Sequence, residues 1–301
     1  MCSTGNQVPV EAMRERPIGV FDSGLGGLTV VRELTRTMPG EDIIYLGDTA
    51  RVPYGTKSPQ IVRRFALECA SFLLTFSPKM IVVACNTATA AAIDDLRKAC
   101  PVAVVDVIAP GARLACERTD RPIGVIATEG TVASGAYQRA IAAIDHGRKV
   151  MAVACPLLVP IVEDGRDEND PLVKLALMDY LRELQRFRPG ALILGCTHYP
   201  LIKGAIDRVM GPDVAIVSSA QAAAAEAQRQ LSLSGLASSR SYGGRLRCHS
   251  TDNPDRFARM GERFGGRRID HVDQVTAEEL EACLRRAEGG ATLGGSTADA
   301  K

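Results

Sequence analysis

MIVVACNTA, at residues 80–88, is the stretch that decides the fold: an apolar, largely β-branched run ends at a small residue, a cysteine and two polar residues. This pattern is typical of a buried strand that runs into a loop, with Cys85 at its carboxyl end. The stretch ALILGCTHYP, at residues 191–200, repeats the pattern and ends a second strand at Cys196. Open α/β sheets bind ligands at the carboxyl ends of their strands, so both thiols are candidates for one site.

Short apolar runs alternate with helical patterns along the rest of the chain. Further strands are predicted at residues 17–22, 43–46, 102–106, 122–127 and 246–251. Helices are predicted at residues 28–38, 59–76, 88–98 and 254–264. Strands and helices that alternate in this way indicate parallel βαβ units and an α/β fold.

Two echoes along the chain indicate an internal duplication. PIGVIATEG at residues 122–130 echoes PIGVFDSG at residues 17–24, an offset of 105, and the two cysteine runs are offset by 111. Two echoes at nearly one offset favour two similar parallel-sheet α/β halves related by a pseudo-two-fold axis, with the site in the cleft between them. Chance similarity among α/β strand ends is the alternative.

The composition excludes several function classes. The chain has 301 residues, 24% of them charged, and a net charge of +1, which gives no bulk attraction to nucleic acid or to a membrane surface. No apolar stretch approaches the roughly 20 residues of a membrane span. Nine cysteines without a CxxC pair, after a polar N-terminal stretch, favour free thiols in a reducing compartment. Residues 1–13 and 285–301 are predicted to be disordered ends, the latter because the end of the chain reads GGATLGGST.

The segment DSGLGG, at residues 22–27, joins the first strand to the first helix. It lacks the spacing of a dinucleotide fingerprint, because Thr29 stands where the last glycine would fall, and it lacks the lysine of a P-loop. We predict a loop whose N–H groups and Ser23 hydroxyl hold a carboxylate, with a tight turn that merely needs glycine as the alternative. Asp22 would orient or deprotonate a neighbouring group, or simply cap the helix.

The two strand-end cysteines have polar neighbours that suit chemistry. Asn86 and Thr87 follow Cys85, and Thr197 and His198 follow Cys196, so donors stand beside each sulfur. Buried cysteines often act only as small hydrophobes, which is the alternative. His198 is predicted to tune or reprotonate Cys196, because a Cys-x-His pair with Cys85 matches no structural zinc spacing. A loop after the second strand also places Tyr54 and Gly55 where they could face a ligand.

Six motifs carry a family resemblance that covers residues 17–272. In chain order they are FDSGLGGL (21–28), YLGDTARVPYG (45–55), ACNTA (84–88), GVIATEGT (124–131), ACPLLVPIVE (154–163) and LGCTHYPL (194–201). In these motifs the chain resembles the glutamate racemases of the cofactor-independent aspartate/glutamate racemase superfamily. The resemblance implies two α/β domains, one of residues 14–108 with 219–275 and one of residues 109–218, and no cofactor or metal.

The resemblance also implies the site residues. Cys85 and Cys196 match the acid/base thiols, Asp22 matches the carboxylate near the first, and Glu163 and His198 match the groups near the second. The matching substrate-binding positions are Asp22, Ser23, Tyr54, Gly55, Asn86, Thr87, Thr128, Thr131, Thr197 and His198. Helix N-termini after each cysteine strand, together with His198, are expected to raise the thiolate fraction.

The activity implied is interconversion of L- and D-glutamate by 1,1-proton transfer at Cα, which would supply D-glutamate for peptidoglycan precursors in a bacterial cytoplasm. The expected partner is glutamate, with no nucleic acid or membrane, and the family suggests a homodimer. Three alternatives stay open at this point: an aspartate racemase, a non-catalytic binding module on the same scaffold, and a thiol redox enzyme. Facing thiols across a substrate-sized gap would lie too far apart for a disulfide.

Overall fold

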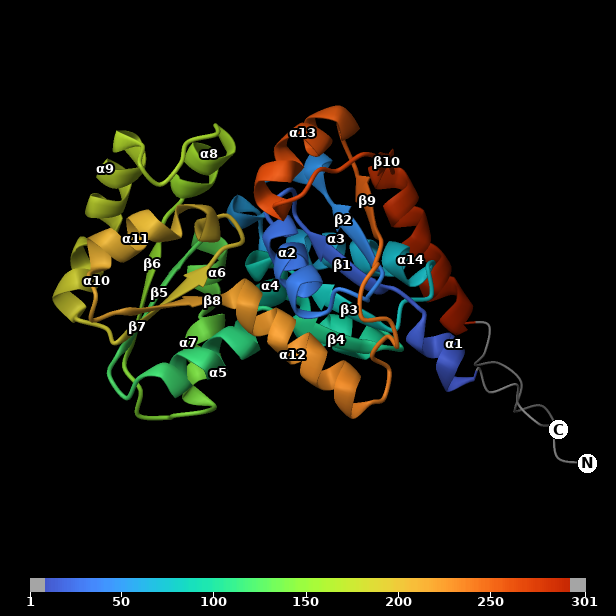
Figure 1. The fold of residues 1–301 in the computed structure, drawn as a ribbon, viewed down its shortest axis with the longest axis horizontal. Helices are drawn as coiled ribbons and strands as arrows, with labels where there is room; N and C mark the ends of the chain where they lie inside the picture. The colour runs from blue at the N-terminus through green and yellow to red at the C-terminus, as the bar shows by residue number, and fades with distance from the viewer. Residues whose placement is uncertain (1–8, 293–301) are drawn as a thin grey trace, which may run out of the picture.

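The computed structural model describes residues 9–292, which form two parallel sheets covered by helices (Figure 1). The strand order is β10-β9-β2-β1-β3-β4 in the six-stranded sheet and β6-β5-β7-β8 in the four-stranded sheet. Every paired strand in both sheets is parallel, so the predicted α/β fold with two similar sheets is confirmed. We call the six-stranded sheet and its helices the first lobe, and the four-stranded sheet and its helices the second lobe.

The first lobe is built from both ends of the chain. Its strands are β1 (Ile18–Asp22), β2 (Ile43–Gly47), β3 (Met80–Val83), β4 (Ala103–Asp106), β9 (Leu246–Ser250) and β10 (Val272–Gln274). Its helices are α1 (Val10–Arg14), α2 (Leu28–Thr37), α3 (Pro59–Leu74), α4 (Asn86–Ala99), α13 (Pro254–Gly265) and α14 (Ala277–Thr292), with short 3₁₀ turns η1 (Thr49–Arg51) and η2 (Tyr54–Thr56).

The second lobe is one continuous part of the chain. Its strands are β5 (Ile123–Ala127), β6 (Val150–Ala154), β7 (Ala191–Gly195) and β8 (Ala215–Ser218). Its helices are α5 (Ile108–Arg118), α6 (Glu129–Ser134), α7 (Ala136–Ala142), α8 (Leu158–Glu163), α9 (Pro171–Tyr180), α10 (Arg182–Phe187) and α11 (Lys203–Met210), and the 3₁₀ turn η3 (Tyr199–Ile202) follows β7. The helix α12 (Ser219–Leu233) leads back and packs against both α5 and α2.

The sequence dictates these elements through burial and capping. The strands β1, β2, β3, β5 and β7 are buried at every position, which is why they read as continuous apolar runs rather than alternating ones. The helix α3 is capped by Ser58, whose side chain accepts from the N–H of Ile61, and Pro59 is the first residue of the helix. The helix α6 is followed by Gly135, its C-cap, whose positive φ of 66° suits glycine.

The two lobes share one topology, as the duplication predicts. The order β2-β1-β3-β4 in the first lobe matches the order β6-β5-β7-β8 in the second. Ile18 of β1 pairs with Met80 of β3, and Ile123 of β5 pairs with Ala191 of β7. Ile123 follows its equivalent Ile18 by 105 positions, and Ala191 follows its equivalent Met80 by 111 positions. These are the offsets of the two sequence echoes. Chance similarity would not reproduce both the strand order and the offsets.

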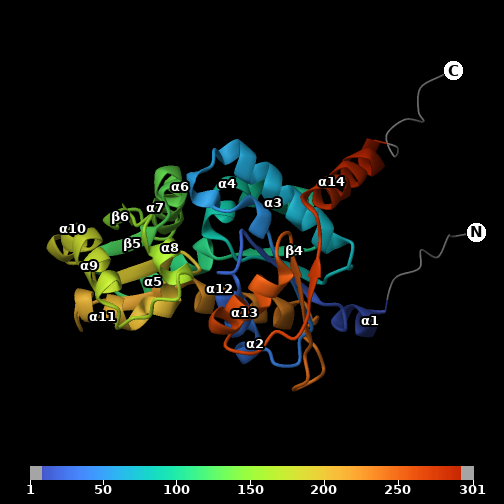
Figure 2. The same cartoon turned by 90° about the horizontal axis from the view of Figure 1, so that it is seen from above.

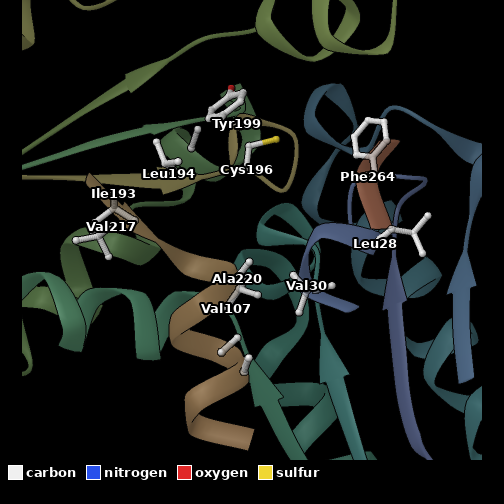
Figure 3. Close-up of a cluster of buried hydrophobic side chains, with 14 of the residues drawn as sticks. Leu28, Val30, Val107, Ile193, Leu194, Cys196, Tyr199, Val217, Ala220 and Phe264 are labelled. Atoms are coloured by element: carbon white, nitrogen blue, oxygen red, sulfur yellow. The ribbon is translucent and has the colours of Figure 1, made fainter. Parts of the chain in front are cut away.

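A continuous apolar core ties the lobes together. In Figure 3, Leu28, Val30 and Phe264 lie on the first-lobe side, and Ile193 and Leu194 on the second, within one buried cluster. Val107 and Ala220 sit between them, on the two connections that cross from lobe to lobe. Figure 1 shows α12 between the two lobes, where it contacts α5 of the second lobe and α2 of the first, and Figure 2 gives the view from above. The domain boundaries near residues 108 and 218 stay a prediction.

Both predicted disordered ends are partly helical, which corrects that prediction. The helix α14 runs to Thr292, and α1 covers residues 10–14. The glycine-rich composition misled because Leu280 and Cys283 give α14 a buried stripe that packs against α3. Arg14 donates from Nε to the carbonyl of Gly235, which fastens the end of α1. Residues 1–8 and 293–301 of the predicted ends lie outside the described residues. Within residues 9–292, no helix is both long and apolar enough to cross a membrane.

Candidate active site

A cavity of about 320 Å³ opens between the carboxyl ends of the two sheets. Its volume falls at the lower end of the range that small-molecule sites occupy. Cys85 lines it from the first lobe and Cys196 from the second, as the strand-end pattern predicts. The predicted residues that line it are Ser23, Tyr54, Gly55, Cys85, Asn86, Thr87, Thr128, Glu163, Cys196, Thr197 and His198.

Cys85 is the N-cap of α4 and is almost fully buried. Its Sγ accepts from the N–H of Ala88 at 3.4 Å, and its thiol donates to Oγ of Ser23 at 3.7 Å. Burial and the nearby Asp22 carboxylate together raise the pKa of this thiol to about 12, although the Ala88 N–H and the Ser23 hydroxyl, which can donate to a thiolate, oppose the shift. Cys85 is therefore a thiol at neutral pH and is ready to donate a proton.

Asp22 lies beneath the glycine-rich loop rather than on the cavity wall. Its Oδ2 accepts from the N–H groups of Gly24 at 3.1 Å and Gly27 at 3.0 Å. Its Oδ1 has no hydrogen-bond partner among the described residues. Burial raises the pKa of this carboxyl, and the nearby His198 opposes the shift. Two of the loop N–H groups, which were predicted as a whole to hold a carboxylate, therefore already bind Asp22. Ser23 and Gly24 are the residues of this loop that line the cavity.

Cys196 has a different set of neighbours. Its Sγ lies 3.8 Å from Nδ1 of His198, whose Nε2 lies 2.9 Å from Oε1 of Glu163. Burial lowers the pKa of His198, but the contacts with Cys196 and Glu163 outweigh burial and raise it to about 10. The same bond to His198 lowers the pKa of Glu163. At neutral pH a buried imidazolium therefore stands between the thiol and a carboxylate.

The expectation of a helix N-terminus after each cysteine strand holds only for Cys85. After Cys196 the chain makes a tight turn, in which the N–H of Tyr199 bonds back to the Cys196 carbonyl at 3.3 Å, and continues as the 3₁₀ turn η3. The regular helix α11 begins only at Lys203. His198, and not a helix dipole, supplies the positive charge beside the second thiol.

Threonines and an asparagine form the polar wall. The hydroxyls of Thr87, Thr128 and Thr131 lie 2.9 to 3.3 Å apart and join α4 to α6. Thr131 is buried behind the other two and does not line the cavity. Asn86 accepts from the hydroxyl of Tyr137 at 2.7 Å, and its Nδ2 has no partner within residues 9–292. Asn86 therefore keeps a free amide donor at the cavity wall.

Two predicted contact residues act mainly through shape. The hydroxyl of Tyr54 donates to Asp48, so the tyrosine offers its ring to the cavity. A Cβ on Gly55 would lie 2.8 Å from Cβ of Thr128, so only glycine allows the two lobes to approach here. Sequence reasoning did not assign a role to the rest of the wall, although all of it except Thr56 lies within the six motifs: Gly24, Val52, Pro53, Thr56, Glu129, Pro156, Val159, Pro160 and Gly195.

The part of the chain that the structure describes contains no cluster of side chains suited to bind a metal ion. No group of three or more His, Cys, Asp or Glu side chains there is arranged to hold an ion. Cys85 and Cys196 are both free thiols. What the site offers is two buried sulfurs from two equivalent strand ends, hydroxyl and amide donors between them, and one cationic imidazole.

Comparison with known proteins gives a consistent answer. The family model for Asp/Glu/hydantoin racemases matches residues 18–227. The glutamate racemase of Geobacter metallireducens is 45% identical over 264 residues, covering 87% of this chain and 97% of that protein. The crystal structure of glutamate racemase isoform RacE1 from Bacillus anthracis matches with a TM-score of 0.84 at 40% identity, over 88% of this chain and 98% of that one. That of Francisella tularensis glutamate racemase in complex with D-glutamate matches with a TM-score of 0.83 at 37% identity, over 89% and 99%.

The fold, the paired thiols and these matches identify the class: the chain belongs to the Asp/Glu/hydantoin racemase family and is an isomerase. Within that family it belongs with the glutamate racemases, which it matches over almost their whole length.

Proposed function

We propose that this enzyme interconverts L- and D-glutamate by proton transfer between Cα and two thiols on opposite faces of the substrate. The observation that carries the proposal is that Cys85 and Cys196, equivalent residues of two equivalent strand ends, line one cavity from opposite lobes. Racemisation in both directions requires the acid and the base to exchange roles, which two residues of one type do best.

In one direction the Cα–H bond breaks as an S–H bond forms on one cysteine. The S–H bond of the other cysteine then breaks, and its proton forms the new Cα–H bond on the opposite face. The electron pair left at Cα must be stabilised meanwhile, and preorganised donors do this most effectively. Ser23, Asn86, Thr87 and Thr197 are the donors that line the cavity between the thiols.

The neighbours of each thiol suit one half of this exchange. A thiol is a nucleophile or base only as its thiolate, so each cysteine needs a partner that takes or returns a proton. Asp22 serves this role near Cys85, and the His198–Glu163 pair serves it at Cys196, where the imidazolium stabilises a thiolate. The remaining substrate contacts are proposed at Tyr54, Gly55 and Thr128, with Thr131 supporting Thr128 from behind.

Glutamate is proposed as the substrate because the relatives matched over nearly their full length are glutamate racemases, one of them with D-glutamate bound. The product D-glutamate would serve peptidoglycan precursor synthesis in the bacterial cytoplasm. The homodimer implied by the family stays a prediction, which sedimentation of the purified chain tests.

The experiment is incubation of the purified, reduced protein with L-glutamate in D2O without added cofactor. Loss of optical rotation together with deuterium at Cα is expected, and much slower turnover of L-aspartate. Cys85→Ser and Cys196→Ser should each remove racemisation, because each removes one of two obligatory proton carriers. Near-normal turnover in either variant would refute the two-thiol mechanism, and glutamate binding without exchange would favour a binding module.

A further inference from the structure

The helix α13 belongs to the first lobe but reaches the group that serves the second thiol. Figures 1 and 2 show it on the side of the first lobe nearest α8. Arg263 of α13 donates from Nη1 to the carbonyl of Val162 at 2.7 Å and from Nη2 to the carbonyl of Arg166. Val162 immediately precedes Glu163, the last residue of α8. A side chain of one lobe therefore holds the backbone that carries the carboxylate of the other.

The chemistry of this contact is that of a helix C-terminus. The last carbonyls of a helix lack partners and carry partial negative charge, so a guanidinium there is favourable. Gly165, at a φ of 90°, turns the chain just after α8. A Cβ on Gly165 would lie 4.0 Å from Nη1 of Arg263, which shows how closely the arginine packs on the turn. The planar fork of arginine presents a separate nitrogen to each carbonyl, a fixed geometry that the single ammonium of lysine does not reproduce.

The next residue of α13 supports the other member of the pair. The ring of Phe264 meets the imidazole of His198 edge-on, with centroids 5.2 Å apart and planes at 81°. Phe264 is fully buried, so this contact restricts the rotation of the imidazole. Two consecutive residues of one helix thus brace Glu163 through its backbone and His198 through its ring.

We propose that Arg263 is a positioning residue, which holds the end of α8 so that Glu163 keeps His198 aligned on Cys196. The proposal rests on the proposed two-thiol function. Arg263 does not line the cavity, so its effect reaches the substrate only through the Glu163–His198 pair. Removing its fork should loosen the 2.9 Å contact between His198 and Glu163 while leaving Cys85 and its surroundings unchanged.

The pKa of His198 is the quantity that should report on the Glu163–His198 contact, because it depends on the charged groups around this pair. His198 faces Cys196 on its own turn, Glu163 on α8 and Asp22 at the end of β1, and Glu163 in turn faces Arg256 on α13. If Glu163 moves away from His198, one of the contacts that raise the His198 pKa is weakened, while burial still lowers that pKa. The pKa of His198 should then fall from about 10 toward the ordinary value near 6.5.

The experiment compares Arg263→Met, Arg263→Lys and the control Arg259→Met. Arg259 lies on the same helix, is exposed and makes no ion pair or side-chain hydrogen bond with the residues that the structure describes, 9–292. Glutamate turnover is measured alongside imidazole NMR titration, which is tractable because the chain has only four histidines. Arg263→Met should lower kcat about tenfold or more with a smaller change in KM, and lower the His198 pKa by roughly one unit. Arg263→Lys should recover part of both effects, and Arg259→Met should change neither.

The proposal is overturned if Arg263→Met keeps the wild-type kcat and His198 titration, or if kcat falls while the titration is unchanged. If Arg263→Met does not fold, the same two measurements on Arg263→Lys decide. Failure of the proposed function is distinguishable, because an inactive wild-type protein still shows whether the His198 titration depends on Arg263.

Discussion

At Gly26, the addition of a single methyl group should lower catalytic activity strongly while the protein still folds. It lies in the first lobe, against the turn that carries Cys196 and His198. A Cβ there would stand 2.2 Å from Oγ1 of Thr197 and 2.6 Å from the His198 ring. Ordinary contacts begin near 3.4 Å, so the turn would have to move by roughly 1 Å. The hydroxyl of Thr29 lies 2.9 Å from the Thr197 carbonyl, which resists that movement.

The size of the effect follows from this displacement. A misplacement of about 1 Å in a catalytic group costs on the order of 100-fold in rate, or about 2.7 kcal/mol of transition-state stabilisation. Overpacking a buried site costs about 1 to 3 kcal/mol of unfolding free energy. Gly26→Ala should therefore lower kcat/KM about 100-fold in a protein that still folds.

The assay is polarimetry with L-glutamate, with urea unfolding of the same preparations. Gly265→Ala is the control, because its nearest neighbour, Cβ of Leu28, would lie at an ordinary 3.9 Å. The control should keep wild-type kcat/KM. Gly26→Ala with wild-type activity and stability would refute the close approach of the two lobes at the Cys196 turn.

Two further predictions concern the groups behind the thiols. Protonated His198, with a pKa near 10 against an ordinary 6.5, stabilises the fold fully below pH 6.5, and this contribution is lost as the pH rises through about 10. Glu163→Gln should therefore destabilise the protein most near pH 6 and progressively less toward pH 10, as measured by urea unfolding across that range; an equal loss at both ends would contradict the assignment. Tyr137→Phe leaves Oδ1 of buried Asn86 without its 2.7 Å donor and should cost about 1 to 3 kcal/mol of unfolding free energy. An unchanged denaturation midpoint would show that Asn86 does not depend on this bond.

Much of the fold could be predicted because the apolar strand runs and the internal duplication both indicate two parallel-sheet α/β halves. Runs such as residues 80–83 are buried on both faces, so their continuous apolar character indicated parallel strands. The offsets of 105 and 111 predict a second, similar sheet, and the same offsets separate the equivalent residues of the strand register. The two thiols could be found because a strand end is both a sequence feature and a ligand site.

What could not be predicted depends on contacts distant in sequence. Tyr54 lines the cavity as predicted, but the bond from its hydroxyl to Asp48 could not be foreseen. Asp22 was predicted to bind substrate, but it binds the N–H groups of its own loop and does not line the cavity. The bonds from Arg263 to the end of α8 span about 100 residues and leave no motif in the sequence. The composition of residues 285–301 predicts disorder, yet α14 runs to Thr292, and its buried Leu280 and Cys283 lie in the part of the helix before that segment.

The central claim is that two different thiols take and give the proton. The most direct measurement is the deuterium content of substrate and product at low conversion of L-glutamate in D2O. Because the thiol that removes the Cα proton is not the one that delivers the new proton, the D-glutamate formed should carry deuterium while the remaining L-glutamate keeps its original proton. Deuterium entering the remaining L-glutamate as fast as the product, or D-glutamate that retains the original proton, would contradict the two-thiol account.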